Sequence, residues 1–287
     1  MNPTLRGLVL ATVAAVVIAT SCGNASDERT GDPASDTTAA PSDCAASEPE
    51  ALRPEILRTV AHDPTAYTQG LVFAGDRLLE SAGRYDESRL RSIDPDTGAE
   101  LDSVDLPDEV FAEGLAVGAD GEVVQLTWKE GIAYRWDADG FEPLGEFSYD
   151  GEGWGLTTLD DGRFVMSDGS DELTVRDPQD FSVISGHRVV RADGPSDELN
   201  ELEWDGASVW ANRYQSDELL RIDPTCWTVT GVADLSAVRD AALEVADEGG
   251  TPIDVTNGVA SVPGTNRFLV TGKWWPTMYE VTFVPVG

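Results

Sequence analysis

The stretch "FAEGLAV", residues 111–117, decides the fold because a version of it occurs five times in the chain. Each copy steps into an apolar run: "TQGLV" (68–72), "AEGLA" (112–116), "GWGLT" (153–157), "NELEW" (200–204) and "TNGVA" (256–260). We take the residue before Leu or Val as an anchor, which gives Gly70, Gly114, Gly155, Glu201 and Gly258. The anchors are 44, 41, 46 and 57 residues apart. A period near 40–45 residues with several strands in each repeat is typical of a β-propeller.

The repeats also share a later landmark. A third apolar run ends 24, 23, 22, 22 and 24 residues after its anchor, at Asp94, Asp137, Asp177, Asp223 and Thr282. The intervening runs are rich in β-branched and aromatic residues and are bounded by Gly, Asp and Pro, which favours strands. One helix is expected within residues 235–250, as an insertion that explains the longest step.

The two ends of the repeat region predict how the ring closes. The last repeat stops after three strands, at "YEVTFVPVG", and a spare strand, "EILRTV" (55–60), precedes the first repeat. We therefore predict an all-β, five-bladed β-propeller over residues 51–287, in which the N-terminal strand becomes the outer strand of the last blade. Closure of this kind removes an exposed sheet edge.

The residues before the propeller predict export. Residues 1–21 combine Arg6 with the apolar run "LVLATVAAVVIAT" and small residues at a cleavage site, which is a signal-peptide pattern. Cys22 follows directly and resembles a lipidation site, although Ala19 stands where Leu is usual; ordinary cleavage and release is the alternative. Residues 22–50, rich in Ser, Thr, Asp, Ala and Pro, are expected to form a flexible tether. The protein would then lie on the outer face of the cytoplasmic membrane or be secreted.

Composition excludes several partners. The formal net charge is −34, from 53 acidic and 19 basic residues, so a nucleic-acid partner is not expected. Membrane association is expected only through a lipid anchor. The chain is expected to be a monomer. Cys44 and Cys226 are a candidate disulfide in an oxidising compartment. With no CxxC motif and only two histidines, a His/Cys metal site is not expected.

The repeat also points to a site. The residue before each anchor should lie at the mouth of the central channel, and these residues are Gln69, Glu113, Trp154, Asn200 and Asn257. Four of them carry a carboxyl or amide group, and their convergence suggests a ligand site. A water-filled polar channel without chemistry is the alternative. Later turns should add a second ring near the same face, made of Tyr85, Trp128, Asp168, Tyr214 and Lys273.

These motifs resemble the plant and bacterial type of glutaminyl-peptide cyclotransferase. The resemblance runs in one order from "HDPTAYTQGL" (62–71) through "LLESAG" (78–83), "FAEGL" (111–115), "QLTWKEGIA" (125–133), "GEGWGL" (151–156), "SDGSDEL" (167–173), "LNELE" (199–203) and "VWANRYQSD" (209–217) to "NGVA" (257–260) and "TGKWWP" (271–276). It implies a five-bladed propeller that closes the N-terminal glutamine of peptides or proteins to pyroglutamate and releases ammonia, without a cofactor or metal.

The resemblance also implies roles for single residues. Glu113 is placed as the general acid and base, and Lys273 and Asn200 as groups that hold the oxyanion or the amide. The substrate-binding set is Gln69, Tyr67, Glu80, Trp128, Trp154 and Tyr214. Glu80 is a candidate either to bind the substrate ammonium or to brace the pocket. Glu201 and Glu203 are interpreted as strand-holding residues.

Two departures from the family pattern leave alternatives open. Tyr67 stands where Phe is usual and Tyr214 where Trp is usual, so altered specificity or rate is expected. A propeller that binds a peptide N-terminus without turning it over is the second hypothesis. A propeller hydrolase with an axial calcium ion, bound by oxygens of Glu113, Asn200 and Asn257, is a third.

Overall fold

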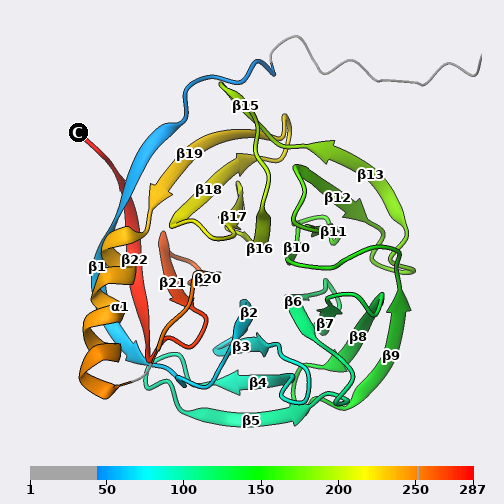
Figure 1. The fold of residues 1–287 in the computed structure, drawn as a ribbon. Coiled ribbons are helices and arrows are strands. Elements are labelled where there is room, and N and C mark those ends of the chain that lie inside the picture. Colours follow the sequence, from blue (N-terminus) through cyan, green and yellow to red (C-terminus); the bar gives the residue numbers. More distant parts are fainter. Residues whose placement is uncertain (1–43, 251) are drawn as a thin grey trace, which may run out of the picture. The chain divides into compact units, whose positions relative to one another are not determined.

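The computed structural model describes residues 44–250 and 252–287, and these residues form five blades arranged around a centre (Figure 1). The strands within each blade are antiparallel, and the fourth and fifth blades are joined into one ten-stranded sheet. The predicted signal peptide, Cys22 and most of the predicted tether lie outside the described residues. The first two blades are β2 (Thr68–Ala74), β3 (Arg77–Ala82), β4 (Arg89–Ile93) and β5 (Glu100–Asp105), then β6 (Ala112–Val117), β7 (Glu122–Thr127), β8 (Ile132–Asp137) and β9 (Pro143–Ser148).

The remaining blades follow the same order. The third is β10 (Leu156–Thr158), β11 (Phe164–Met166), β12 (Glu172–Arg176) and β13 (Val183–Arg188), and the fourth is β16 (Leu199–Trp204), β17 (Val209–Arg213), β18 (Glu218–Asp223) and β19 (Thr228–Asp234). The fifth is β20 (Thr256–Ser261), β21 (Arg267–Gly272), β22 (Thr277–Pro285) and β1 (Glu50–Ala61). Two short strands, β14 (Val190–Arg191) and β15 (Gly194–Pro195), lie beside β19.

The ring closes through the N-terminal strand, as predicted. β1 runs antiparallel to β22 from the pair Leu52–Pro285 to the pair Ala61–Thr277. Its first three residues also pair in parallel with residues 231–233 of β19, so β1 joins the fifth blade to the fourth. The strand begins at Glu50, which is earlier than the 55–60 stretch that the sequence suggested, because residues 50–52 find this second partner.

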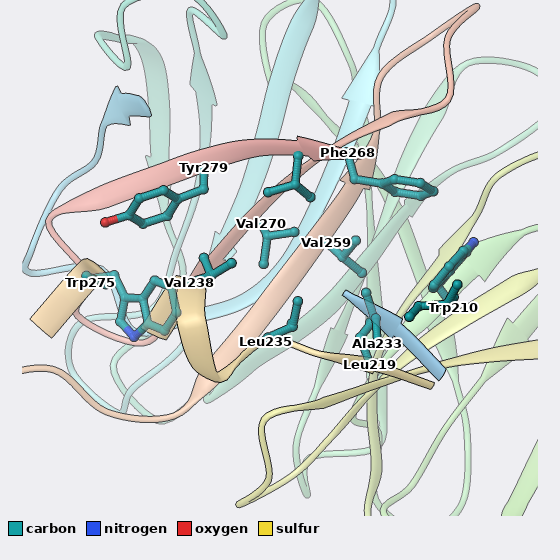
Figure 2. Close-up of a cluster of buried hydrophobic side chains, with 13 residues drawn as sticks. Trp210, Leu219, Ala233, Leu235, Val238, Val259, Phe268, Val270, Trp275 and Tyr279 are labelled. Carbon is teal, nitrogen blue, oxygen red and sulfur yellow. The ribbon is translucent and has the colours of Figure 1, made fainter. Parts of the chain in front are cut away.

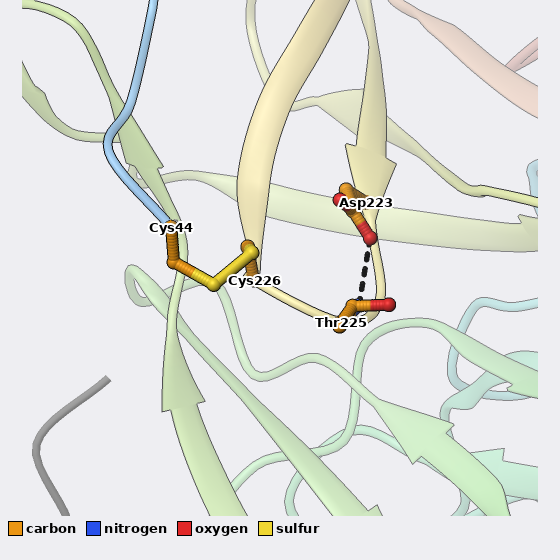
Figure 3. Close-up of a disulfide and its surroundings, with 4 residues drawn as sticks. All are labelled: Cys44, Asp223, Thr225 and Cys226. Carbon is orange, nitrogen blue, oxygen red and sulfur yellow. Dashed lines mark hydrogen bonds between the residues drawn. A yellow bond between two sulfur atoms is a disulfide. The ribbon is translucent and has the colours of Figure 1, made fainter. Parts of the chain in front are cut away.

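A disulfide lies just before this closing strand. Cys44 and Cys226 are bonded, with their Cα atoms 5.2 Å apart (Figure 3). Cys226 follows Asp223 in the turn between β18 and β19, and the Asp223 carboxylate accepts a hydrogen bond from the backbone N–H of Thr225 at 2.8 Å. The disulfide therefore fixes the start of the described chain to the fourth blade.

The inner strands pack backbone against backbone at the centre. A Cβ atom on Gly155 would lie 2.0 Å from the carbonyl oxygen of Asn200 in the next blade, and one on Gly114 would lie 2.7 Å from the Cα atom of Gly155. Glycine at these anchors is thus required by the close approach of neighbouring blades. In the fourth blade the anchor is Glu201, whose carboxylate accepts hydrogen bonds from the backbone N–H groups of Leu71 and Val259.

The predicted helix is α1 (Ser236–Gly249), ended by Gly250 in the left-handed conformation with φ 69°. It lies on the outside of the ring near β1 and β22 (Figure 1). Its buried side chains join a cluster that packs the fourth blade against the fifth, shown in Figure 2, which includes Leu235, Val238, Val270, Trp275 and Tyr279. Within the described residues, no helix has the length and apolar character that a membrane crossing requires.

Candidate active site

A cavity of about 350 Å³ brings eight of the nine predicted catalytic and substrate-binding residues together. The predicted residues that line it are Tyr67, Gln69, Glu113, Trp128, Trp154, Asn200, Tyr214 and Lys273. Three further residues, Arg84, Phe111 and Trp274, complete the lining. The volume is in the range of small-molecule sites, and the lining combines aromatic walls with a few convergent polar groups.

β-bulges aim the polar side chains of the inner strands. The strand register shifts between Thr68 and Gly70, between Ala112 and Leu115, and between Leu199 and Leu202. Gln69, Glu113 and Asn200 fall within these three irregularities. A bulge leaves a residue unpaired and re-aims its side chain, so each of these three blades turns one polar group into the cavity without exposing the apolar face of its strand.

Glu113 is buried and unpartnered. It is 6% exposed, and no group of the described residues donates a hydrogen bond to its carboxyl group. Burial raises its pKa well above the ordinary range; the charge of Lys273 opposes the rise, and the carboxylates of Glu152 and Glu130 add to it. A carboxyl group with a raised pKa and no hydrogen-bond partner among the described residues can exchange a proton with a bound ligand.

Lys273 supplies the positive charge of the cavity. Its ammonium group donates a hydrogen bond to Oε1 of Gln69 and lies over the ring of Tyr67, 4.6 Å from the ring centroid. Burial lowers its pKa to about 8, against the opposing charges of Glu113 and Asp254. At neutral pH the group is still mainly protonated, so it can stabilise negative charge that develops on a ligand.

The added hydroxyl of Tyr67 has a partner. It donates to Oδ2 of Asp254 at 3.3 Å, and burial raises the pKa of Tyr67 above its usual value. The phenol therefore stays neutral and keeps its ring against Trp274, with the two centroids 4.8 Å apart. The structure accommodates this departure from the family pattern without moving the ring out of the cavity.

The two indoles of the cavity are held by one carboxylate. Glu152 Oε2 accepts hydrogen bonds from Nε1 of Trp128 at 2.7 Å and from Nε1 of Trp154 at 3.1 Å. Lys129 completes this group, since its ammonium lies 3.7 Å from the centroid of the Trp128 ring and 3.4 Å from Glu152 Oε1. Tyr214 packs edge-on against Trp154, at a centroid distance of 5.5 Å. The result is a fixed aromatic wall in the cavity that also contains the Glu113 carboxyl group and the Lys273 ammonium group.

Comparison with known proteins identifies the family. The glutamine cyclotransferase family matches residues 33–283 of the chain. A glutaminyl-peptide cyclotransferase from Arabidopsis thaliana is 36% identical over 231 residues, which cover 79% of this chain and 70% of that protein. The crystal structure of Myxococcus xanthus glutaminyl cyclase superposes with a TM-score of 0.76 and 36% identity, over 84% of this chain and all of that one. The chain belongs to the glutamine cyclotransferase family.

The predicted family and the predicted fold are both confirmed by these matches. The activity that goes with the family is that of a glutaminyl-peptide cyclotransferase, an aminoacyltransferase. The cavity of this chain is lined by a buried carboxyl group, an ammonium group, two side-chain amides and several aromatic rings. Such a set can hold a short polar side chain, move a proton and stabilise an oxyanion in one place.

Glu80 does not line the cavity. Its side chain is fully buried; it receives hydrogen bonds from Thr68 Oγ1 and from Arg91 Nε at 2.6 Å, and lies 2.9 Å from His62 Nε2. His62 and Arg91 lower the pKa of this carboxyl group below its usual range against the effect of burial. Of the two roles expected for Glu80, this geometry favours bracing the pocket over binding the substrate ammonium.

Asn257 also lies apart from the cavity lining, although it occupies the same repeat position as Glu113 and Asn200. Its Nδ2 donates to the carbonyl oxygen of Thr68 at 3.0 Å. The three oxygens suggested for an axial calcium ion are thus not gathered in one cavity. Within residues 44–250 and 252–287, no cluster of three His, Cys, Asp or Glu side chains has metal-binding geometry.

Sequence reasoning missed Arg84, Phe111 and Trp274. The ring centroid of Phe111 lies 5.6 Å from that of Trp128 and 6.4 Å from that of Tyr67, so Phe111 belongs to the aromatic wall. Trp274 adopts a φ of 63°, which is unusual for a bulky residue, and its N–H donates to Ala66 O at 2.7 Å. Trp274 directly follows the predicted site residue Lys273, and this adjacency is the feature of the sequence that could have indicated its place in the cavity.

Proposed function

We propose that the protein converts the N-terminal glutamine of peptides or proteins to pyroglutamate and releases ammonia, using only its own side chains. The observation that carries this proposal is the Glu113 carboxyl group, which is buried, receives no hydrogen bond from the described residues and shares the cavity with Lys273. The family match supports the reaction class, and the geometry supports the assignment of roles.

The proposed chemistry begins with orientation. The aromatic wall of Phe111, Trp128 and Trp154 folds the glutamine side chain back towards its own α-amine, since ring closure depends mainly on holding the two groups in contact. The amine nitrogen then attacks the side-chain amide carbon, and a new C–N bond forms as the carbonyl π electrons move to oxygen. Glu113 takes the proton that this nitrogen loses.

The collapse of the tetrahedral intermediate uses the same groups. The oxyanion is stabilised by Lys273 and by the amide of Asn200, with Gln69 holding the lysine in place. Glu113 returns its proton to the amide nitrogen, the old C–N bond breaks and ammonia leaves. An α-amine has a pKa near 7.7–8.0, so a carboxyl group whose pKa is raised well above 4.5 is better matched to this transfer than an ordinary glutamate.

The experiment compares two equivalent substitutions on inner strands. Glu113→Gln should lower kcat for a Gln-initiated peptide by on the order of 10² or more, measured as ammonia release and the mass loss of the peptide. Glu203→Gln is the matched control, because Glu203 is equally buried, also has a raised pKa and does not line the cavity. Equal losses in both variants would remove the assigned role of Glu113.

The binding hypothesis is separated by the same assay. If the wild-type protein binds a Gln-initiated peptide and leaves it intact at every pH, cyclisation is not its function.

Export, with a lipid on Cys22, remains part of the proposal. It is supported by the sequence of residues 1–23 and by the bond between Cys44 and Cys226, which suits an oxidising compartment. Mass spectrometry of the mature N-terminus tests it.

A further inference from the structure

A second cavity adjoins the first. Its volume is about 610 Å³, and it shares three lining residues, Tyr67, Arg84 and Trp274, with the cavity that contains Glu113. The rest of its lining comes from residues 64–65, 82–83, 87, 89, 105 and 252. Because the same three side chains form a wall of both cavities, the two are separated only by the thickness of these groups.

The size of the first cavity requires an exit for the rest of a peptide. Its volume of about 350 Å³ is near the lower end of the range for small-molecule sites, so it suits one residue and little more. A peptide substrate continues beyond its first residue and advances at most about 3.6 Å per residue. The residues after the glutamine must therefore cross the wall of the first cavity within one or two positions.

Arg84 and Trp274 form the boundary that such a chain would cross. The Arg84 guanidinium lies 5.5 Å from the centroid of the Trp274 ring. Its ion pair with Glu87, at 3.2 Å, joins two side chains that are 46% and 58% exposed, so it is weak and its donors are free to exchange partners. Arg89, which lines the second cavity only, is instead held by Asp63.

The boundary loop is also tied to the strand that carries Glu113. Ser88 Oγ donates to the carbonyl oxygen of Arg84 at 2.8 Å and accepts from the N–H groups of Arg84 at 3.1 Å and Ala112 at 2.9 Å. Ala112 directly precedes Glu113. The guanidinium is thus attached to a loop that is fixed relative to the acid, which is the arrangement expected of a residue that positions a substrate.

We propose that the second cavity binds the residues that follow the N-terminal glutamine, with Arg84 donating to a peptide carbonyl and Trp274 packing against the side chain of the second residue. This inference rests on the proposed function. The formal charges of the lining residues sum to zero, because Arg84 and Arg89 are balanced by Glu87 and Asp105. Selection is therefore by chain length and by an aromatic second residue rather than by charge.

The test compares glutamine amide with the peptide amides Gln-Ala-Ala and Gln-Phe-Ala. In the wild type, kcat/KM should rise by about tenfold from glutamine amide to Gln-Phe-Ala amide, and less to Gln-Ala-Ala amide. In Arg84→Ala this ratio should fall towards one, mainly through KM. Arg53→Ala is the control, since Arg53 has a similarly exposed ion pair, with Glu55, and lines neither cavity. A wild-type ratio near one, or an unchanged ratio in Arg84→Ala, would overturn the proposal.

A binding measurement keeps this result separate from the reaction itself. Calorimetry with Glu113→Gln and Gln-Phe-Ala amide needs no turnover, and adding Arg84→Ala should weaken binding by about tenfold if the second cavity is a subsite. If the double variant binds as tightly as Glu113→Gln alone, the subsite is refuted. If binding weakens as expected but the wild type cyclises no substrate, the subsite stands and the proposed function fails.

Discussion

Replacing Glu203 with Gln tests how buried carboxyl groups on the inner strands limit stability. Glu203 is 5% exposed, and its Oε1 accepts a hydrogen bond from the N–H of Ser261 at 2.8 Å. Burial raises its pKa to about 8 from an ordinary value of 4.5. The folded state therefore holds this proton more tightly than the unfolded chain does. Its stabilising contribution is complete below the unfolded pKa and is lost as the pH rises through the folded pKa.

The size of the loss follows from the two pKa values. Each pKa unit corresponds to about 1.4 kcal/mol, so complete ionisation costs about 5 kcal/mol, of which roughly 3 to 4 kcal/mol falls between pH 5 and pH 8. Gln stays neutral throughout and keeps an amide oxygen for Ser261. The free energy of unfolding of Glu203→Gln, minus that of the wild type, should rise by this amount over the same range.

The assay is urea denaturation at each pH from 5 to 8, followed by tryptophan fluorescence. Taking the difference between variant and wild type cancels the titration of groups that both proteins share. A difference that stays flat within about 1 kcal/mol across this range would refute the reasoning, because it would mean that Glu203 titrates alike in the folded and unfolded states.

Three further outcomes are expected. Replacing both Cys44 and Cys226 with Ser removes a cross-link between residues 182 positions apart, so the unfolded chain gains conformational freedom. The free energy of unfolding should fall by up to about 5 kcal/mol, and an unchanged urea midpoint would contradict this. Gly155→Ala places a Cβ atom 2.0 Å from the carbonyl oxygen of Asn200, so we expect a loss of at least about 2 kcal/mol by the same measurement, and wild-type stability would disprove the close approach. After correction for ionisation of the substrate amine, kcat/KM should fall roughly fivefold between pH 8 and pH 9 as Lys273, whose pKa is about 8 in the free protein, loses its proton, and Lys273→Arg should lack this fall.

Much of the architecture was predictable because the repeat records it directly. The anchor spacing gives five blades, since each blade must present its inner strand to the same axis. The position of Gly155 explains why the anchor is so regular: any larger residue would collide with the neighbouring blade. The early start of β1 at Glu50 was not predictable, because the parallel pairing of residues 50–52 with β19 involves a partner about 180 residues away and leaves no local pattern.

The site was predictable where its residues occupy a repeated position, either on an inner strand or in the loop that follows a second strand. Gln69, Glu113 and Asn200 share one repeat position, and the bulge there turns all three into the cavity. Arg84 and Trp274 lie directly beside the repeated positions Tyr85 and Lys273, but the repeat marks those positions and not their neighbours. The sequence could not decide between the two roles expected for Glu80, because its neighbours His62 and Arg91 surround it only after folding and together satisfy its charge inside the blade.

Three glutamates of the inner strands show what separates a structural acid from a reactive one. Burial raises the pKa of Glu113, Glu201 and Glu203 alike. Glu201 accepts hydrogen bonds from backbone N–H groups of the first and fifth blades, and Glu203 accepts one from the fifth, so their oxygens are committed to joining blades. Glu113 receives none from the described residues and is left to a ligand. The three residues are all glutamates of similar burial, so they are distinguished by their surroundings: backbone N–H groups of other blades at Glu201 and Glu203, and the cavity with Lys273 at Glu113. The closed ring sets these surroundings.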